Sequence, residues 1–177
     1  MIDLPSSDAA VMVTCSIEAA GRYRIPTHIL LAVAAVENGR PGQRVANTNG
    51  SSDIGPMQFN TRYIRSLSRY GITEADVADT GCYPFHLAAW RLRRHLMQDS
   101  GDFWTRVANY HSRTPVFNQT YRRKLIARGA EWAAWLQASK STAPTSSNAP
   151  PRPSNEWREG IRSQDRYVPR MITRSSG

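Results

Sequence analysis

Apolar residues recur along most of the chain at the three- and four-residue spacing of a buried helix face, which predicts a mainly helical protein. The clearest case is residues 84–98, where one stripe is apolar and the opposite face carries arginines. The segments predicted to be helical are 7–23, Pro26 or Thr27 to Glu37, 61–70, a short turn after Thr73, 84–98, 102–110 and 115–137.

The same spacing selects the residues expected to point inward from each helix. They are Val11, Ile17 and Ala20; Ile29, Leu30, Val33 and Val36; Tyr63, Ile64 and Leu67; Phe85, Ala88, Ala89, Leu92 and Leu96; Phe103, Trp104 and Val107; and Phe117, Tyr121, Leu125 and Trp132.

Residue types at the helix ends support these boundaries. Thr73 and Thr114 are suited to cap the helices that follow them, and Pro115 fits a first helical turn. Gly71 can end one helix, and Gly39 is expected to be the left-handed residue that closes the helix ending at Glu37.

Glu37 is an unusual carboxylate for a helix end. It follows Ala34-Ala35-Val36, so both the apolar surroundings and the negative end of the helix dipole should disfavour its anion and raise its pKa. A carboxyl group that stays protonated near neutral pH is what a general acid requires. A solvated residue at a helix end is the alternative that the helix alone leaves open.

A second carboxylate follows in the polar segment Asn47–Asn60. Its turn-forming run Asn47-Thr48-Asn49-Gly50-Ser51-Ser52 leads into Asp53, after which apolar residues alternate with Gly55 and Pro56. Such a segment can place Asp53 opposite Glu37, and two carboxyl groups in different environments form the working pair of a glycosidase. A turn-forming aspartate bonded to nearby backbone amides is the alternative.

These residues carry a resemblance to two groups of wall-cleaving enzymes. Asn47–Asn60 resembles the substrate hairpin of c-type lysozymes, with Asp53 at the position of their second carboxylate. Gly55-Pro56-Met57-Gln58 resembles the Gly-Leu-Met-Gln signature of soluble-type lytic transglycosylases, with Pro56 where Leu is usual. Over roughly residues 12–137, the chain resembles a small branch of that family found beside conjugation and type IV secretion systems.

The resemblance implies a lysozyme-like, mainly α fold with a small β-hairpin, to which the composition after residue 138 adds a flexible C-terminal tail. It implies catalysis by Glu37 and Asp53. It further implies substrate binding by Met57, Gln58, Asn60 and Tyr110, where Ala108-Asn109-Tyr110-His111-Ser112 resembles the family's Ala-Tyr-Asn segment with His111 at the usual Asn.

The two-residue spacing of Gln58 and Asn60 also favours a role in substrate binding. Gln58 and Asn60 would point the same way in an extended segment, toward sugar hydroxyl or acetamido groups, while Met57 and Phe59 face the core. A structural role in closing the turn is the alternative for this pair.

The expected reaction is cleavage of the β-1,4 bond between N-acetylmuramic acid and N-acetylglucosamine in peptidoglycan. A transglycosylase would need only Glu37 and would give a 1,6-anhydromuramyl product, whereas a lysozyme-type hydrolase would also use Asp53. The transglycosylase is favoured because the resembled branch implies it. A non-catalytic wall-binding assembly module is the rival from another class.

The composition of the chain is compatible with peptidoglycan as the binding partner. The formal net charge of +9 suits a polyanionic cell wall, and nucleic acid is not expected because no recognition motif accompanies the charge. The four His residues are scattered and the two Cys do not form a Cys-x-x-Cys pair, so neither a metal nor another cofactor is expected.

Cys15 and Cys82 leave two possibilities open. A bridge would close a long loop and stabilise the fold by about 4 kcal/mol on the chain-entropy account, while two buried free thiols are common in reducing compartments. Members of the resembled branch carry cysteines in comparable places, which implies the bridge.

The predicted organisation is a wall-cleaving domain over residues 1–138, a Pro/Ser-rich linker over 139–154 and a basic, disordered tail over 155–177. The tail is a candidate contact for secretion, conjugation or pilus assembly proteins. No run is long enough to span a bilayer. The start does not resemble a signal peptide, although the expected location is periplasmic or secreted.

Overall fold

The computed structural model describes residues 7–141 and shows a mainly helical fold with one small antiparallel sheet, as predicted. The elements are α1 (Ser7–Tyr23), α2 (Thr27–Glu37), β1 (Arg44–Ala46), β2 (Ser52–Ile54), β3 (Phe59–Asn60), α3 (Thr61–Leu67), the 3-10 helix η1 (Ser68–Tyr70), α4 (Glu74–Ala78), α5 (Tyr83–Gln98), α6 (Phe103–Ala108) and α7 (Pro115–Ser141).

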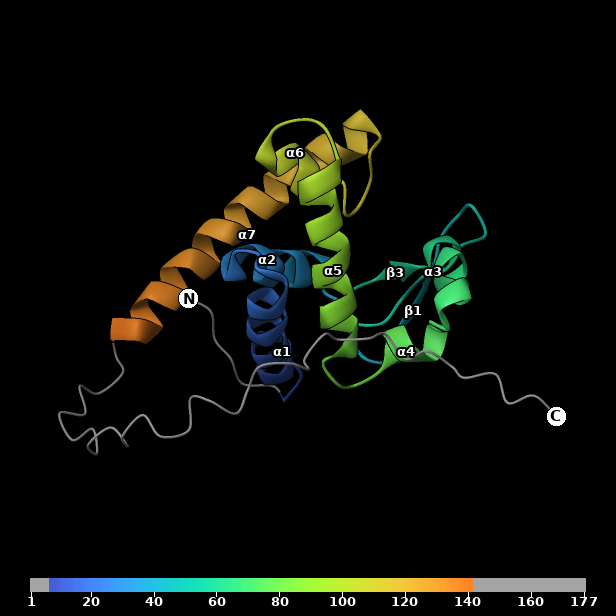
Figure 1. Ribbon diagram of the computed structural model, residues 1–177, viewed down its shortest axis with the longest axis horizontal. Helices are drawn as coiled ribbons and strands as arrows, with labels where there is room; N and C mark the ends of the chain where they lie inside the picture. The colour runs from blue at the N-terminus through green and yellow to red at the C-terminus, as the bar shows by residue number, and fades with distance from the viewer. Residues whose placement is uncertain (1–6, 142–177) are drawn as a thin grey trace, which may run out of the picture. The chain divides into compact units, whose positions relative to one another are not determined.

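Helix α2 is the centre of the hydrophobic core. Its residues from Ile29 to Ala34 are all buried, as expected of a helix that is apolar on every side. It packs against α1, α5 and α7 and crosses the middle of the helical part in Figure 1. Burying each large aliphatic side chain contributes roughly 1.5–3 kcal/mol, so α2 is held firmly up to its last turn, which carries Glu37.

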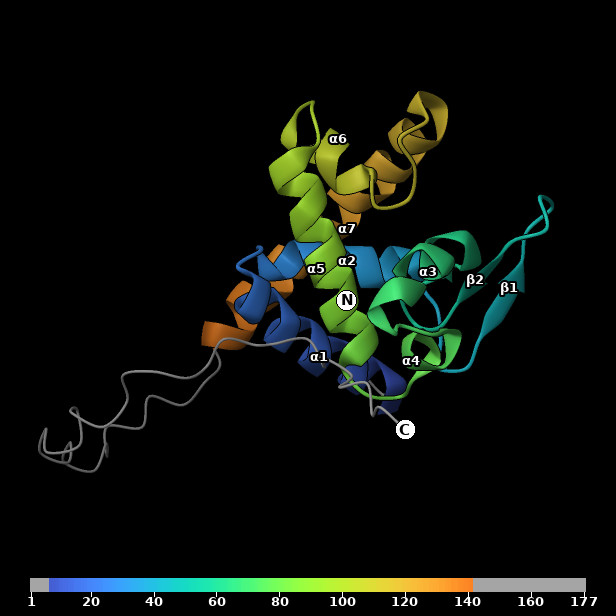
Figure 2. The same cartoon turned by 45° about the vertical axis from the view of Figure 1, so that its right-hand side comes forward.

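The sheet has three strands in the order β1-β2-β3, one more than the predicted hairpin. Val45 pairs with Asp53 across the first strand pair, and Asp53 pairs with Asn60 across the second. In Figure 1 the strands, α3 and α4 lie on one side of α5, while α1 and the C-terminal half of α7 lie on the other, and Figure 2 shows the strands and α3 again to the right of α5.

A disulfide joins Cys15 of α1 to Cys82, which directly precedes α5. The two residues are 67 positions apart in the sequence, and their Cα atoms are 4.9 Å apart. The bond therefore cross-links the first helix to the start of the fifth.

The inward face of α1 differs from the predicted one. Val11 and Ile17 are 38% and 43% exposed, so their assignment to the core is wrong, whereas Ala20 is buried. The buried stripe contains Val13, Ser16 and Ala19 together with the bridged Cys15. The helix is rotated relative to the simple apolar stripe because this face packs against α2 and α5 and carries the disulfide.

Two aromatic residues near the ends of helices are also more exposed than predicted. Phe103 is 37% exposed at the start of α6, and Phe117 is 58% exposed near the start of α7. In α7 the buried position is taken by Asn118, whose amide donates to the backbone oxygens of Thr105 and Ser112. Hydrogen bonding of Asn118 thus determines which face of the first turn of α7 is buried. The spacing of apolar residues does not reveal this.

Most predicted helix ends agree with the structure. Thr73 and Asp76 form a reciprocal capping box on α4, and Gly71 closes η1 with φ of 74°. α7 begins at the predicted Pro115 but continues to Ser141, so it includes the first three residues of the predicted linker.

The end of α2 is an exception. Asn38, with φ of 49°, is the left-handed residue that closes α2, and its backbone N–H donates to Ala34. The prediction that Gly39 is this left-handed residue is wrong, since Asn38 takes that conformation and Gly39 does not. Gly39 instead lies against the backbone of Gly55 and Pro56, where a Cβ atom has no room.

The rest of the predicted linker and tail, residues 142–177, lies outside the described residues, and the predictions for it remain untested. Within residues 7–141, no helix combines the length and apolar character needed to cross a membrane.

Replacing Gly39 with Ala tests this close approach. A Cβ atom at that position would overlap the carbonyl oxygen of Gly55 and lie 2.8 Å from Nε2 of Gln58. We expect the free energy of unfolding, measured by urea denaturation, to fall by about 2–4 kcal/mol. The matched control is Gly21→Ala within α1, where a Cβ atom meets nothing within 4 Å. That variant should gain roughly 0.5–1 kcal/mol, and similar effects of the two substitutions would contradict the prediction.

Candidate active site

Glu37 occupies the last turn of α2 and is only partly buried. Removal of its carboxyl group from water raises its pKa from 4.5 to about 7, and the nearby charge of Asp53 acts in the same direction. A hydrogen bond from Tyr121 and the charges of Arg91 and Lys124 oppose this rise. The carboxyl group is therefore divided between its two protonation states near neutral pH, which is the property that the sequence predicted.

Tyr121 fixes the orientation of this carboxyl group. It lies on the buried face of α7, and its hydroxyl donates to Oε1 of Glu37 at 2.5 Å. Burial first, and then the charge of Glu37, raise the pKa of Tyr121 well above its ordinary value, so the phenol stays protonated and remains a donor.

Sequence reasoning placed Tyr121 in the core and did not include it in the site. The available signal was its polar group, because a buried tyrosine hydroxyl normally needs a hydrogen-bond partner.

Asp53 lies in β2 and is held by two side-chain amides. Asn47 Nδ2 donates to one carboxylate oxygen at 3.0 Å and Asn60 Nδ2 donates to the other at 2.8 Å. The charge of Asp53 influences both Glu37 and His111, so these three residues lie around the same region. Its partners are side chains, not the backbone amides of the turn alternative.

Asn60 and Gln58 do not form the parallel pair that an extended segment would give. Gln58 has φ of 48° and lies in the turn before β3, where its side-chain amide donates to Gly55 O at 2.8 Å. Asn60 caps α3 by accepting from Arg62 N, and it donates to Asp53 and Ser51. Both side chains have structural partners, and both are partly exposed beside the Asp53 region.

Met57 and Tyr110 support the site from beneath. Met57 is fully buried and Tyr110 is 2% exposed, so both side chains lie beneath the surface of the site, and their role in substrate binding remains a prediction. The Tyr110 hydroxyl donates to Met57 O at 3.0 Å. This bond links the α6–α7 connection to the turn between β2 and β3. Phe59, predicted to face inward, is also fully buried.

Arg91 is a second residue that sequence reasoning did not place in the site. Its guanidinium lies over the rings of Tyr63 and Tyr110, at 4.2 and 4.5 Å from their centroids. It also donates to Tyr110 O at 2.6 Å. Arg91 thus brings a positive charge from α5 to the carboxyl group of Glu37 and contacts aromatic side chains from two other segments.

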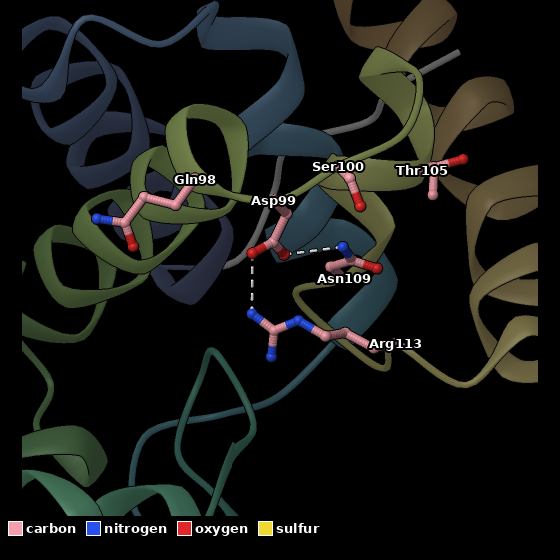
Figure 3. A pocket seen from close by; sticks show the side chains of 6 residues that line it. All are labelled: Gln98, Asp99, Ser100, Thr105, Asn109 and Arg113. Carbon is pink, nitrogen blue, oxygen red and sulfur yellow. Dashed lines mark hydrogen bonds and ion pairs between the residues drawn. The ribbon is translucent and has the colours of Figure 1, made fainter.

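A polar network holds the segment that carries Tyr110 and His111. Asp99 accepts from Asn109 at 2.8 Å and from Arg113 at 3.0 Å, as Figure 3 shows, and its other close partner is His95 at 2.7 Å. Burial would raise the pKa of Asp99, but the hydrogen bonds from Arg113, His95 and Asn109 hold it well below its ordinary value.

This network borders a recess of about 410 Å³ lined by Gln98, Asp99, Ser100, Thr105, Asn109 and Arg113. None of these six residues is hydrogen-bonded to Glu37, whose side-chain partner is Tyr121. Asn109 also accepts from Asn118 at 2.8 Å. The connection from α6 to α7 is therefore fixed at several points.

The structure brings Glu37, Asp53, Met57, Gln58, Asn60 and Tyr110 together, with Tyr121, Arg91 and His111 added. Cys15 and Cys82 form the disulfide between α1 and α5 instead. The arrangement can supply a proton from Glu37, an oriented anion at Asp53 and several amide groups suited to a polar ligand. Among residues 7–141, no cluster of three His, Cys, Asp or Glu side chains is arranged to hold a metal ion.

Comparison with known proteins defines the family to which the chain belongs. Protein IpgF of Shigella flexneri is 35% identical over 111 residues, which cover 62% of this chain and 72% of that protein. The chain therefore belongs to the family of protein IpgF. Invasion protein IagB of Salmonella typhimurium is 27% identical over 111 residues, covering 62% of this chain and 69% of that protein. No protein-family profile matches the sequence.

The raised pKa of Glu37 makes a prediction about stability. Because the folded-state pKa of about 7 exceeds the ordinary 4.5, the contribution of Glu37 to stability is fully present below pH 4.5 and is lost as pH rises through 7. Glu37→Gln should match the wild type near pH 4.5 and be more stable at pH 8, by about 3 kcal/mol at most. Chemical denaturation at both pH values measures this. Glu131→Gln, at an exposed position, is the control, and parallel behaviour of the two variants would contradict the prediction.

Tyr121→Phe tests the hydrogen bond to the acid. Because this bond lowers the pKa of Glu37, its removal should move that pKa further above 7, as measured by NMR titration of ¹³C-labelled glutamate carboxyl groups. Tyr110→Phe is the control, since the Tyr110 hydroxyl bonds to Met57 and not to Glu37. An unchanged or lower Glu37 pKa in Tyr121→Phe would show that the bond does not stabilise the anion.

Proposed function

We propose that this protein is a peptidoglycan-cleaving lytic transglycosylase with Glu37 as its general acid and base. The observation that carries the proposal is a partly exposed carboxyl group with a pKa of about 7, oriented by a buried tyrosine. The resemblance of Gly55–Gln58 to the transglycosylase signature supplies the substrate class, the β-1,4 bond between N-acetylmuramic acid and N-acetylglucosamine.

The reaction needs one carboxyl group in two protonation states. Protonated Glu37 gives its proton to the glycosidic oxygen as the bond from that oxygen to C1 of the muramyl unit breaks. The resulting carboxylate then accepts the proton of the muramyl 6-hydroxyl as that oxygen bonds to C1, which closes the 1,6-anhydro ring. A pKa near the working pH suits both steps, and acid–base catalysis of this kind contributes about 10²–10⁴ in rate.

Asp53 favours a second candidate, a lysozyme-type hydrolase. Its carboxylate is close enough to influence the pKa of Glu37, and it could stabilise a positively charged sugar or attack it. However, both of its oxygens already accept amide hydrogen bonds, which lowers the nucleophilicity of the anion. The transglycosylase is therefore the preferred proposal, with Asp53 as an electrostatic or structural residue.

The setting of the reaction is proposed from composition and from the relatives. A chain of net charge +9 suits an anionic wall, and one relative is named an invasion protein. We infer that the protein works in the periplasm or outside the cell and opens the wall locally for a secretion, conjugation or pilus apparatus. A non-catalytic wall-binding module with the same partners is the alternative that activity measurements distinguish.

Mass spectrometry of soluble products from purified peptidoglycan tests the proposal. Wild-type protein should release 1,6-anhydromuramyl products, and Glu37→Gln should lower their rate of release at least about 100-fold. The activity of Asp53→Asn should stay within about tenfold of the wild-type activity. The substitution disturbs the hydrogen bonds from Asn47 and Asn60, but it removes no chemical step. Glu131→Gln is the control for removal of a glutamate charge.

The other outcomes are equally informative. Reducing-end products that disappear in Asp53→Asn would establish the hydrolase instead. Absence of products from folded wild-type protein, together with retained binding to the wall, would favour the binding module and overturn the enzyme proposal.

A further inference from the structure

His111 occupies an exposed position beside Tyr121, the residue that orients Glu37. It follows α6, and its backbone N–H donates to Ala108 O at 3.1 Å. Its ring stacks on that of Tyr121, with centroids 4.8 Å apart and planes inclined by 11°. Because Tyr121 donates to Glu37, the imidazole is one side chain removed from the acid.

The ring nitrogens of His111 have no hydrogen-bond partner among residues 7–141. This contrasts with His95, whose Nδ1 is bonded to Asp99. The imidazole of His111 is thus held in a defined plane by stacking while its polar atoms remain available.

The surroundings of His111 lower its pKa and so favour the neutral ring. Burial of part of the ring lowers its pKa, the charge of Asp53 opposes that effect, and Lys124 and Arg91 lower the pKa further. A neutral imidazole has one N–H donor and one acceptor nitrogen, which suits hydroxyl and acetamido groups because each of these also has both a donor and an acceptor.

Resting on the proposed function, we propose that His111 is a substrate-binding residue that hydrogen-bonds the saccharide unit placed against Glu37, with Tyr121 fixing the plane of its ring. The resembled family has Asn at this position. In this chain the two imidazole nitrogens of His111 would provide the hydrogen-bond donor and acceptor that the Asn side-chain amide provides there. The residue does not bond to Glu37 and takes no proton in the reaction, so its contribution is to binding and to the choice of sugar.

Three substitutions separate hydrogen bonding from stacking. His111→Phe keeps an aromatic ring on Tyr121 but removes both nitrogens. His111→Asn restores a donor and an acceptor without the ring, and His111→Ala removes both features. Each is made in the full chain, and KM and kcat are measured from the release of soluble peptidoglycan products.

We expect His111→Phe to raise KM about five- to tenfold, the effect of losing one hydrogen bond between neutral groups. Its kcat should stay within about twofold and its pH–rate profile should be unchanged, because Tyr121 keeps its aromatic neighbour. His111→Asn should recover part of the KM, and His111→Ala should show the raised KM together with a changed kcat.

Binding measured without turnover provides the second test. In the Glu37→Gln background, isothermal titration with a tetramer of N-acetylglucosamine should show a matching loss of affinity in His111→Phe. Wild-type KM and affinity in His111→Phe would overturn the inference and leave His111 as a packing partner of Tyr121, while the proposed function would stand. A folded parent protein that neither cleaves peptidoglycan nor binds the tetramer would overturn the proposed function and this inference with it.

Discussion

The hydrogen bond from Tyr121 to Glu37 is the interaction on which the candidate site depends. It joins the last turn of α2, whose core residues are all buried, to the second turn of the long helix α7, across 84 positions of the sequence. Packing of α2 removes the carboxyl group from water and raises its pKa, while the phenol limits that rise by supporting the anion. A group balanced between these opposing effects is suited to give a proton and take one back, which neither full solvation nor complete burial would allow.

Two sets of contacts hold the surroundings of this bond. On the sheet side, Asn47 and Asn60 position the carboxylate of Asp53, and the turn at Gly55 lies against the residues that follow α2. On the helical side, Asp99 and Asn118 fix the α6–α7 connection, which presents Tyr110 and His111. The Tyr110 hydroxyl joins the two sides through Met57. Rigid support of this kind reduces the reorganisation that a reaction requires.

The positions of the helices, the raised pKa of Glu37 and the placement of Asp53 near Glu37 could all be predicted from the sequence. Those features follow from apolar spacing and from turn-forming residues, which are local signals. Tyr121 and Arg91 were not placed in the site because their partners are distant in the chain and each residue type has an ordinary local explanation. Asn118 shows a different limit, since its hydrogen bonds to three separate residues override the apolar stripe that favoured Phe117.

Turn conformation was the other source of error. Asn38 and Gln58 both adopt positive φ, although neighbouring glycines are the residues that more often do so. At Gly39 the absence of a side chain is needed for close packing and not for backbone freedom. A glycine in the sequence therefore marks a special position without telling which of these two demands it satisfies.

The cross-link between Cys15 and Cys82 gives the fold a dependence on its chemical surroundings. It closes a loop that contains α2, all three strands and α3 and α4, and on the chain-entropy account such a bond stabilises the native state by about 4 kcal/mol. Disulfides persist in oxidising compartments and are rare where thiols are kept reduced. The same polypeptide would thus be markedly less stable before oxidation, so that maturation of the site is tied to the redox state of the place where the chain folds.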